Sequence, residues 1–269
     1  MSEFSPGWLA LREPADASAR AVELLDPLRE HLDGTTRPVI RDLGAGSGSM
    51  GRWLAPRLGG PQHWVMHDRD PTLLALAAAG MSPFPMVTVE TRQGDVGDLT
   101  TADLAGASLV TASALLDLLT VGEVDQLAAA CVGAGCPALF TLSVAGRVQL
   151  SPADPLDAEV EAAFNNHQRR SDGTRQLLGP DAPGVAAEAF ARLGATVLER
   201  PSPWRLGPEQ AGLAAEWLRG WVSAAVEQRP ELAAHADAYL RRRLDAVAAG
   251  DLRAEVDHRD LLALPSFTG

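Results

Sequence analysis

Residues 42–48 read Asp42-Leu43-Gly44-Ala45-Gly46-Ser47-Gly48 and lie at the end of a short, mostly apolar run, residues 38–43, that is typical of a buried strand. Glycines at such a point allow a tight turn with positive φ and let a ligand lie against bare backbone. A second apolar run, residues 64–67, is followed by Asp68, twenty residues after Gly48. An acid at that separation can accept hydrogen bonds from the hydroxyls of a ribose. The stretch therefore predicts a ligand-binding edge at the carboxyl ends of two neighbouring parallel strands.

Strands and helices are expected to alternate along most of the chain. Further strands are predicted at residues 87–90, 108–111, 138–143, 195–199 and 252–258. Helices are predicted at residues 14–34, 50–58, 71–80, 121–132, 155–168, 184–193 and 208–249, the last one broken at Pro230. Repeated strand–helix units with apolar strands imply a sheet covered on both faces. The expected fold is a doubly wound, mostly parallel, seven-stranded α/β sheet with an added helical cap.

This pattern suggests four parts. They are an N-terminal helical arm at residues 1–35, a sheet-containing core at 36–204, a helical insert at 205–250 and the last strand of the core at 251–269. Long connections between two strands are usually functional. We therefore expect the helical insert to cover the ligand-binding edge of the sheet. The N-terminal arm is expected to contribute to the same lid.

The charge and composition of the chain limit the classes of molecule that it is expected to bind. The formal net charge is −12, and all 23 basic residues are Arg. Without Lys, neither a Schiff base nor a phosphate-loop Lys is possible. Nucleic acids and anionic membranes are disfavoured because both attract basic surfaces, so a small molecule is the expected partner. No apolar stretch is long enough to span a membrane, and the N-terminus lacks the basic start of a signal peptide, so a cytoplasmic protein is expected.

The cysteines and histidines do not suggest a metal site. Cys131 and Cys136 lie close together in an apolar stretch, but no nearby His or second Cys pair completes a zinc site. They are expected to be buried, reduced thiols.

Two kinds of cofactor compete for the glycine loop. Residues 46–51 match the G-x-G-x-x-G pattern of dinucleotide-binding proteins. In dinucleotide-binding proteins the pattern normally begins where the strand ends, which in this sequence is Gly44. When the pattern is counted from Gly44, Ser49 occupies the position of the third glycine. Asp42 would also repel a pyrophosphate, whereas a cationic ligand without phosphate would favour an acid there.

The sequence resembles the class I S-adenosylmethionine-dependent methyltransferases over residues 36–145. Four motifs in order carry the resemblance: Asp42-Leu43-Gly44-Ala45-Gly46-Ser47-Gly48, His67-Asp68-Arg69-Asp70-Pro71, Gln93-Gly94-Asp95-Val96 and Leu109-Val110-Thr111-Ala112-Ser113. The resemblance implies a Rossmann-like fold, S-adenosylmethionine as cofactor, and a loop backbone that carries the methionine portion. It also implies Asp68 as the ribose ligand, Asp95 at the adenine amino group and Val96 at the adenine ring. The cofactor-binding residues it implies are Asp42, Gly44, Ala45, Gly46, Gly48, Asp68, Arg69, Asp95, Val96, Thr111 and Ala112.

Catalytic and substrate-binding candidates lie outside these motifs. Asp117 follows the fourth predicted strand and is a candidate general base, or it orients the acceptor. His167 lies in a polar cluster near the predicted edge and can accept a proton near neutral pH. Arg169, in the same cluster, can hold a carboxylate or phosphate at two points. The substrate-binding candidates are Arg12, Ser113, His167, Arg169 and Trp204.

The expected function is methyl transfer to an O, N or C atom of a small molecule. One alternative is an NAD(P)-dependent oxidoreductase, which would keep the fold; it would call for a Tyr or Lys acid, and the single Tyr is Tyr239. The other is a non-catalytic protein that binds S-adenosylmethionine or S-adenosylhomocysteine. The acceptor and the oligomeric state stay open.

Overall fold

The computed structural model describes residues 5–266, except for the side chain of Asp98. Its central sheet has the strand order β3-β2-β1-β4-β5-β10-β8, and β9 also pairs with β10. The strands are β1 (Val39–Leu43), β2 (Gln62–Asp68), β3 (Val87–Gln93), β4 (Leu109–Ser113), β5 (Ala138–Ser151), β8 (Thr196–Pro201), β9 (Trp204–Leu206) and β10 (Arg253–Leu264). The first five run parallel, and β10 is antiparallel to its neighbours. The predicted doubly wound, mostly parallel sheet is therefore confirmed, with β9 as an addition.

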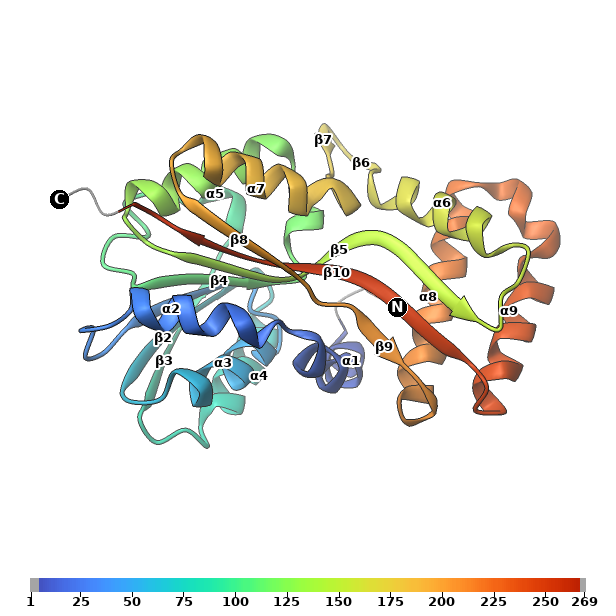
Figure 1. The fold of residues 1–269 in the computed structure, drawn as a ribbon, viewed down its shortest axis with the longest axis horizontal. Coiled ribbons are helices and arrows are strands. Elements are labelled where there is room, and N and C mark those ends of the chain that lie inside the picture. Colours follow the sequence, from blue (N-terminus) through green and yellow to red (C-terminus); the bar gives the residue numbers. More distant parts are fainter. Residues whose placement is uncertain (1–4, 267–269) are drawn as a thin grey trace.

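Helices cover both faces of this sheet (Figure 1). One face packs against α2 (Leu25–His31), α3 (Ser49–Leu58) and α4 (Pro71–Met81), and the other against α5 (Val121–Gly133) and α7 (Ala182–Arg192). Successive strand residues point to opposite faces. Leu109 therefore belongs to the core under α2, α3 and α4, and Val110 to the core under α5 and α7. Burial on both faces explains why the central strands β1, β2 and β4 are mostly apolar runs, whereas the edge strand β3 alternates.

Local signals in the sequence fix where several helices begin. The Asp70 carboxylate accepts a hydrogen bond from the backbone N–H of Thr72 (2.7 Å), and Pro71 takes the first helical position of α4. Thr120 and Glu123 form a capping box at the start of α5. These helices begin at or near the positions that the sequence predicted.

Beyond the carboxyl edge of the parallel strands, β5 and β10 continue as a long antiparallel pair that also carries β9 (Figure 1). Three helices pack with this extension around one core: α6 (Asp157–Gln168), α8 (Ala211–Gln228) and α9 (Ala233–Ala248). Within that core the rings of Trp217 and Trp221 are stacked, with centroids 5.1 Å apart. We call α6, α8 and α9 the cap helices. Helix α6 thus packs with the helices of the predicted insert, although it lies outside residues 205–250.

Several predicted boundaries are wrong. A single helix is expected at residues 14–34, but the structure has three elements there: α1 (Pro6–Ala19), a 3₁₀ turn (Val22–Leu24) and α2. The chain breaks at Ala21, whose backbone N–H donates a hydrogen bond to the Asp260 carboxylate (2.8 Å). Pro14 lies inside α1, and Pro6 starts it after the Ser5 cap. The strands expected at 138–143 and 252–258 are longer, since each provides the other's pairing partner in the extension.

Some short elements were not predicted. They are β6 (Ser171–Asp172), β7 (Arg175–Gln176) and the 3₁₀ turns η2 (Val96–Asp98), η3 (Leu116–Leu118), η4 (Gly179–Asp181), η5 (Pro208–Gln210) and η6 (Pro230–Leu232). Such short segments have too few residues to show a periodicity.

The two cysteines are free and buried, as expected. Burial raises the pKa of the Cys136 thiol to about 12, so it stays protonated and inert at neutral pH. Over residues 5–266 the structure holds no cluster of three His, Cys, Asp or Glu side chains suited to a metal ion. Within the same range no helix combines the length and the apolar character needed to cross a bilayer.

Candidate functional site

The glycine loop links β1 to α3 in a conformation that needs glycine. Gly44, Gly46 and Gly48 have φ values of 60°, 54° and 86°, a region that side chains other than glycine rarely adopt. The backbone N–H of Ala45 donates to the carbonyl of His67 (2.9 Å), which ties the loop to the end of β2. A Cβ on Gly48 would lie 2.9 Å from Cα of Ala77 in α4. The loop is therefore held between two neighbouring elements with no room for a side chain at Gly48.

Replacing Gly48 with Ala should destabilise the protein by about 2 kcal/mol or more, because a strained φ and a backbone overlap add up. Gly60→Ala is the matched control, since Gly60 has a φ of 67° but nothing within 4 Å of its Cβ position. It should lose only about 1 kcal/mol. Urea unfolding of both variants measures the difference, and equal losses would show that the contact with Ala77 is unimportant.

The Asp68 carboxylate lies at the carboxyl end of β2, against this loop. Its Oδ2 accepts a hydrogen bond from the backbone N–H of Gly46 (2.8 Å) and its Oδ1 from that of Asp70 (3.0 Å). The residue is 8% exposed, while the neighbouring Arg69 is exposed. Since each carboxylate oxygen can accept more than one hydrogen bond, Asp68 retains acceptor capacity beside the loop, as a ribose ligand would need.

Asp42, the last residue but one of β1, is fully buried. Its Oδ1 accepts a hydrogen bond from Oγ1 of Thr111 (2.8 Å), but its Oδ2 has no hydrogen-bond partner in the part of the chain that the structure describes. Burial raises the pKa of Asp42 to about 7, although Thr111 and the nearby charge of Arg20 oppose the rise. A buried carboxylate oxygen without a donor is costly, which points to a cationic or donating ligand at this position.

The ends of β3 and β4 supply the other predicted cofactor residues. Asp95 is exposed and accepts a hydrogen bond from the backbone N–H of Gly97 (2.9 Å), and Val96 is half-buried beside it. The backbone N–H of Gly94 donates to the carbonyl of Asp68 (3.1 Å), so this segment lies next to the end of β2. Thr111 and Ala112 are buried in β4. The structure thus brings all four motifs to one edge of the sheet.

The strand end at Ser113 is followed by an unusual backbone conformation. Ala114 has a φ of 51°, and its N–H donates to the carbonyl of Thr141 (2.9 Å). A non-glycine residue with positive φ carries strain, and such strain is often found at functional sites. Asp117 follows in η3, half-buried.

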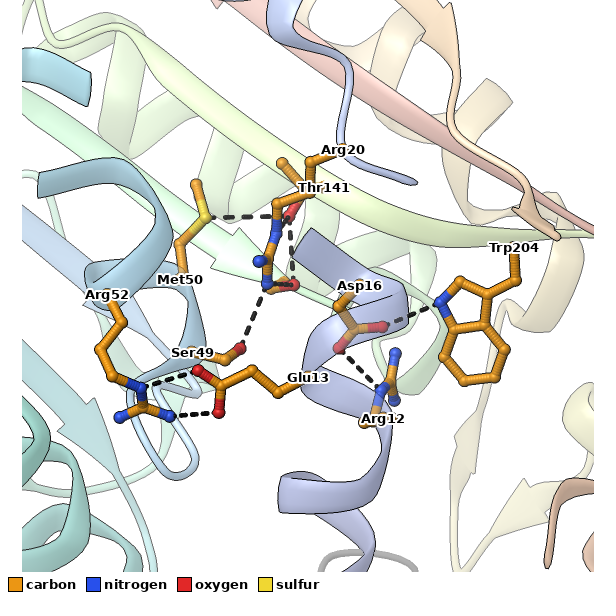
Figure 2. Close-up of polar contacts among 10 residues, drawn as sticks. Arg12, Glu13, Asp16, Arg20, Ser49, Met50, Arg52, Thr141 and Trp204 are labelled. Atoms are coloured by element: carbon orange, nitrogen blue, oxygen red, sulfur yellow. Dashed lines mark hydrogen bonds and ion pairs between the residues drawn. The ribbon is translucent and has the colours of Figure 1, made fainter. Parts of the chain in front are cut away.

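Sequence reasoning missed Arg20, which follows the last residue of α1 and is 3% exposed. Its Nη2 donates to Oγ of Ser49 (3.2 Å) and its Nε to Oγ1 of Thr141 (3.4 Å), as Figure 2 shows. Its Nη2 also donates to Oγ of Ser113 (3.1 Å). Its Nη1 has no hydrogen-bond partner among the described residues. No local signal could have found this residue, because 121 positions separate Arg20 from Thr141.

Helix α1 lies across the glycine loop. The Glu13 carboxylate and the Arg52 guanidinium form two hydrogen bonds (2.6 and 2.7 Å), and Arg52 also donates to the carbonyl of Ser47 (2.6 Å). Cδ1 of Leu9 lies 3.5 Å from where a Cβ of Gly46 would be. Figure 2 shows Glu13 of α1 facing Arg52 of α3. These contacts place α1 against the glycine loop.

Two of the predicted substrate residues, Arg12 and Trp204, come together in one cluster with Asp16. The Asp16 carboxylate accepts hydrogen bonds from Nε of Arg12 and from Nε1 of Trp204, both 2.9 Å (Figure 2). The Arg12 guanidinium also lies 5.0 Å from the centre of the Trp204 ring. This cluster docks α1 onto β9, because Trp204 is the first residue of that strand.

Two further predicted substrate residues, His167 and Arg169, make contacts with other protein side chains, and the fifth, Ser113, accepts a hydrogen bond from Arg20. Nε2 of His167, in α6, lies 3.4 Å from a carboxylate oxygen of Glu227 in α8. Arg169 forms two hydrogen bonds with Asp181 (2.5 and 2.7 Å). Both side chains therefore have protein partners, which the sequence did not predict.

A shallow groove of about 800 Å³ lies on the extension formed by β5, β9 and β10, with Gln149, Arg205 and Arg253 in its lining. Its lining includes none of the predicted site residues. The groove therefore supports none of the predicted roles.

Neither a protein-family model nor a curated protein matches this sequence. Among solved structures, the chain is similar to the cyclopropane synthase MmaA2 from Mycobacterium tuberculosis, with a TM-score of 0.52 and 12% identity over 97% of this chain and 95% of that one. It is also similar to the YcgJ protein from Bacillus subtilis, with a TM-score of 0.50 and 11% identity over 91% of this chain and all of that one (100%). At such low identities the similarity shows a shared fold, which is the Rossmann-like fold that the four motifs implied.

Proposed function

We propose that this chain is an S-adenosylmethionine-dependent methyltransferase that acts on a small-molecule acceptor. One observation carries the proposal: the glycine loop lies between two acids, Asp68 with spare acceptor capacity and Asp42 with a buried oxygen that receives no hydrogen bond from the residues that the structure describes. S-adenosylmethionine has a ribose to bind the first acid, an ammonium and a sulfonium to favour the second, and no phosphate to be repelled by either.

The residues fit this cofactor in the following way. The loop backbone would contact the methionine portion, Asp68 the ribose hydroxyls, and Asp95 with Val96 the adenine. When bound, S-adenosylmethionine supplies an activated methyl group. The chain must then align the acceptor atom and exclude water, and α1 together with the cap helices would close the site.

A proton must be removed from many acceptors during methyl transfer. Asp117 is our first candidate for this role because η3 follows β4 directly, at the edge where the motifs meet. His167 is the second, although its contact with Glu227 also gives it a part in holding α6 against α8. The net charge of −12 and the absence of Lys favour a small acceptor over a nucleic acid. The expected cytoplasmic location stays a prediction.

One observation favours the alternative of a dinucleotide cofactor. A Cβ on Gly51 would lie 3.0 Å from both Met66 in β2 and Met81 in α4. The third glycine of the dinucleotide-binding pattern allows similarly close packing of helix and strand. The buried acid Asp42 weighs against this alternative, because it would lie beside a pyrophosphate.

Calorimetric titration with S-adenosylhomocysteine, and with NADH in parallel, tests the proposal. The full chain should bind S-adenosylhomocysteine with micromolar affinity, and Asp68→Ala should weaken binding by about 100-fold, because two hydrogen bonds to a charged group are lost. Asp26→Ala, which removes an exposed acid of α2, is the control and should bind as the wild type does.

Binding of NADH alone would exclude the methyltransferase assignment, and binding of neither compound would leave the glycine loop without this role. A protein that binds S-adenosylhomocysteine but methylates no member of a broad acceptor panel would favour the non-catalytic alternative.

A further inference from the structure

Strand β3 forms one edge of the central sheet, where β2 is its only strand partner among the described residues. The two strands pair without a bulge from Val87 to Gln93, and β3 contains no proline. Sheet edges are usually protected by short strands, bulges, prolines, charged side chains or a covering segment. The opposite edge strand, β8, ends in Pro201. Strand β3 has only two charged side chains, and they have opposite signs.

Alternate residues of β3 direct their main-chain groups away from β2. The N–H of Gln62 donates to the carbonyl of Met86 (3.0 Å), and the N–H of Gly94 donates to the carbonyl of Asp68 (3.1 Å). In a strand the main-chain groups of one residue point to one side, and those of the next residue point to the other, so the even-numbered residues of β3 bond to β2. The outward N–H and carbonyl groups have no hydrogen-bond partner within residues 5–266 at three positions: Val89, Thr91 and Gln93.

The two charged side chains of β3 lie on a face that no helix covers. Nε of Arg92 lies 2.6 Å from a carboxylate oxygen of Glu90, and the two side chains are 46% and 44% exposed. Residues 94–108, which connect β3 to β4, contain the 3₁₀ turn η2 but no α-helix. Helix α4 packs on the other face of the strand. Met86, directly before the strand, is 55% exposed. The edge thus combines unpaired main-chain groups, a balanced pair of charges and an exposed apolar residue.

We propose that two copies of this chain form a dimer in which their β3 strands pair antiparallel, with Thr91 opposite Thr91 of the second copy. In this register Val89 lies opposite Gln93 of the second copy, and each of these pairs exchanges main-chain hydrogen bonds. The groups that are unpaired in one copy therefore bond to those of the other. The pairing is two-fold symmetric, so the assembly closes at two copies. The two central sheets become one continuous sheet.

The charged side chains select this register. With Thr91 at the centre, Glu90 lies opposite Arg92 of the second copy, and both side chains are on the same face. These pairs are not bonded through the main chain, which is the arrangement that brings opposite side chains closest. A shift of one strand by two residues places Glu90 opposite Glu90, or Arg92 opposite Arg92. Like charges directly opposite each other destabilise a strand pair.

Sedimentation velocity of the full chain tests the dimer, at chain concentrations from about 1 to 200 μM and at about 0.15 M salt. At this ionic strength the general repulsion between two chains of net charge −12 is screened beyond about 8 Å. The wild type should sediment as a monomer at the lowest concentrations and as a dimer at the highest. Arg92→Glu places two acids opposite each other and should raise the dissociation constant by at least about tenfold.

A mixture of two variants tests the register directly. Glu90→Arg has Arg at positions 90 and 92, and Arg92→Glu has Glu at both. Each variant alone places like charges opposite each other and should be monomeric where the wild type dimerises. An equal mixture should dimerise about as strongly as the wild type, because each opposite pair is again one Arg and one Glu. A folding defect in either variant would not produce this recovery.

Arg219→Glu is the matched control, because Arg219 and Glu216 form a similar ion pair on α8, with side chains 50% and 39% exposed. It should dimerise as the wild type does. Thr91→Pro removes the N–H at the centre of the interface. Proline is tolerated in an edge strand where the lost N–H faces solvent, so this variant should stay folded by circular dichroism and yet remain monomeric.

A wild type that stays monomeric at all these concentrations would overturn the proposal. A dimer that is unaffected by both Thr91→Pro and Arg92→Glu would overturn it as well, since the interface would then lie elsewhere. If the single charge variants are monomeric but their mixture does not dimerise, the register with Glu90 opposite Arg92 is wrong. These outcomes do not depend on the binding of S-adenosylmethionine, so the proposed function stands or falls separately.

Discussion

Replacing Asp42 with Asn is expected to stabilise the protein by about 1–3 kcal/mol at pH 8 and to weaken binding of S-adenosylhomocysteine. In the folded protein burial raises the pKa of Asp42 from 3.8 to about 7. Between these values the unfolded chain has lost the proton and the folded protein still holds it, so the contribution of this group to stability falls as pH rises and is lowest above pH 7. A shift of this size corresponds to about 4 kcal/mol, and the unpartnered Asn amide would offset part of the gain.

The stability difference between Asp42→Asn and the wild type should depend on pH. It should be largest at pH 8 and shrink as the pH falls towards and below 3.8, the value of the unfolded chain, where Asp42 becomes protonated in both states. Urea unfolding at several pH values measures it. A difference that does not change with pH would show that Asp42 is ionised throughout this range.

Binding should show the opposite dependence. If the α-ammonium of S-adenosylhomocysteine lies beside Asp42, it favours the ionised carboxylate. Below pH 7 the wild-type affinity should therefore fall by up to about tenfold per pH unit, while the weaker affinity of Asp42→Asn should stay constant from pH 5.5 to 8. Asp42→Asn keeps an oxygen that can accept the hydrogen bond from Thr111, so a change in fold is not expected to account for the loss. A wild-type affinity that does not vary over this range would contradict a cation at Asp42.

Replacing Asp260 with Ala is expected to destabilise the protein by about 3–5 kcal/mol, the second large effect. Asp260 is fully buried in β10. Its Oδ2 accepts a hydrogen bond from the backbone N–H of Ala21 (2.8 Å), and its Oδ1 accepts one from that of Leu142 (2.7 Å), which has a φ of 58°. Removing the carboxylate leaves two buried donors without acceptors, at about 1–3 kcal/mol each.

Asp260→Asn should lose less, because its amide keeps one acceptor oxygen. The control is Asp257→Ala, a half-buried acid of the same strand, which should change stability by no more than about 0.5 kcal/mol. Chemical unfolding at neutral pH measures all three variants. A small loss in Asp260→Ala would mean that water or a local shift satisfies the N–H groups of Ala21 and Leu142.

The cap region shows where local patterns were informative and where they were not. The spacing of Trp217 and Trp221 predicts one helix face, and the two rings are indeed stacked in the core of the cap helices. The polar cluster around His167 and Arg169 suggested a substrate site. Whether a polar side chain faces a ligand or a protein partner depends on distant segments, here Glu227 in α8 and Asp181 in η4.

The sequence by itself determined the parallel sheet and the carboxyl edge on which the motifs meet. Apolar runs, glycines that require positive φ and acids at strand ends are local properties, and parallel strands bring their carboxyl ends together. The positions of Asp42, Gly48 and Asp68 at this edge therefore follow from the order of residues along the chain.

Only the tertiary structure decided what surrounds that edge. It placed α1 across the loop, brought Arg20 to Ser113 and Thr141, and made Asp260 the acceptor for Ala21, 239 positions away in the chain. Contacts between residues so far apart produce no periodic pattern in the sequence. They depend on how the helices and strands pack and on which buried polar groups become hydrogen-bonded. The edge of the sheet and its acids follow from local properties of the sequence, whereas the position of Arg20 beside them follows from the fold.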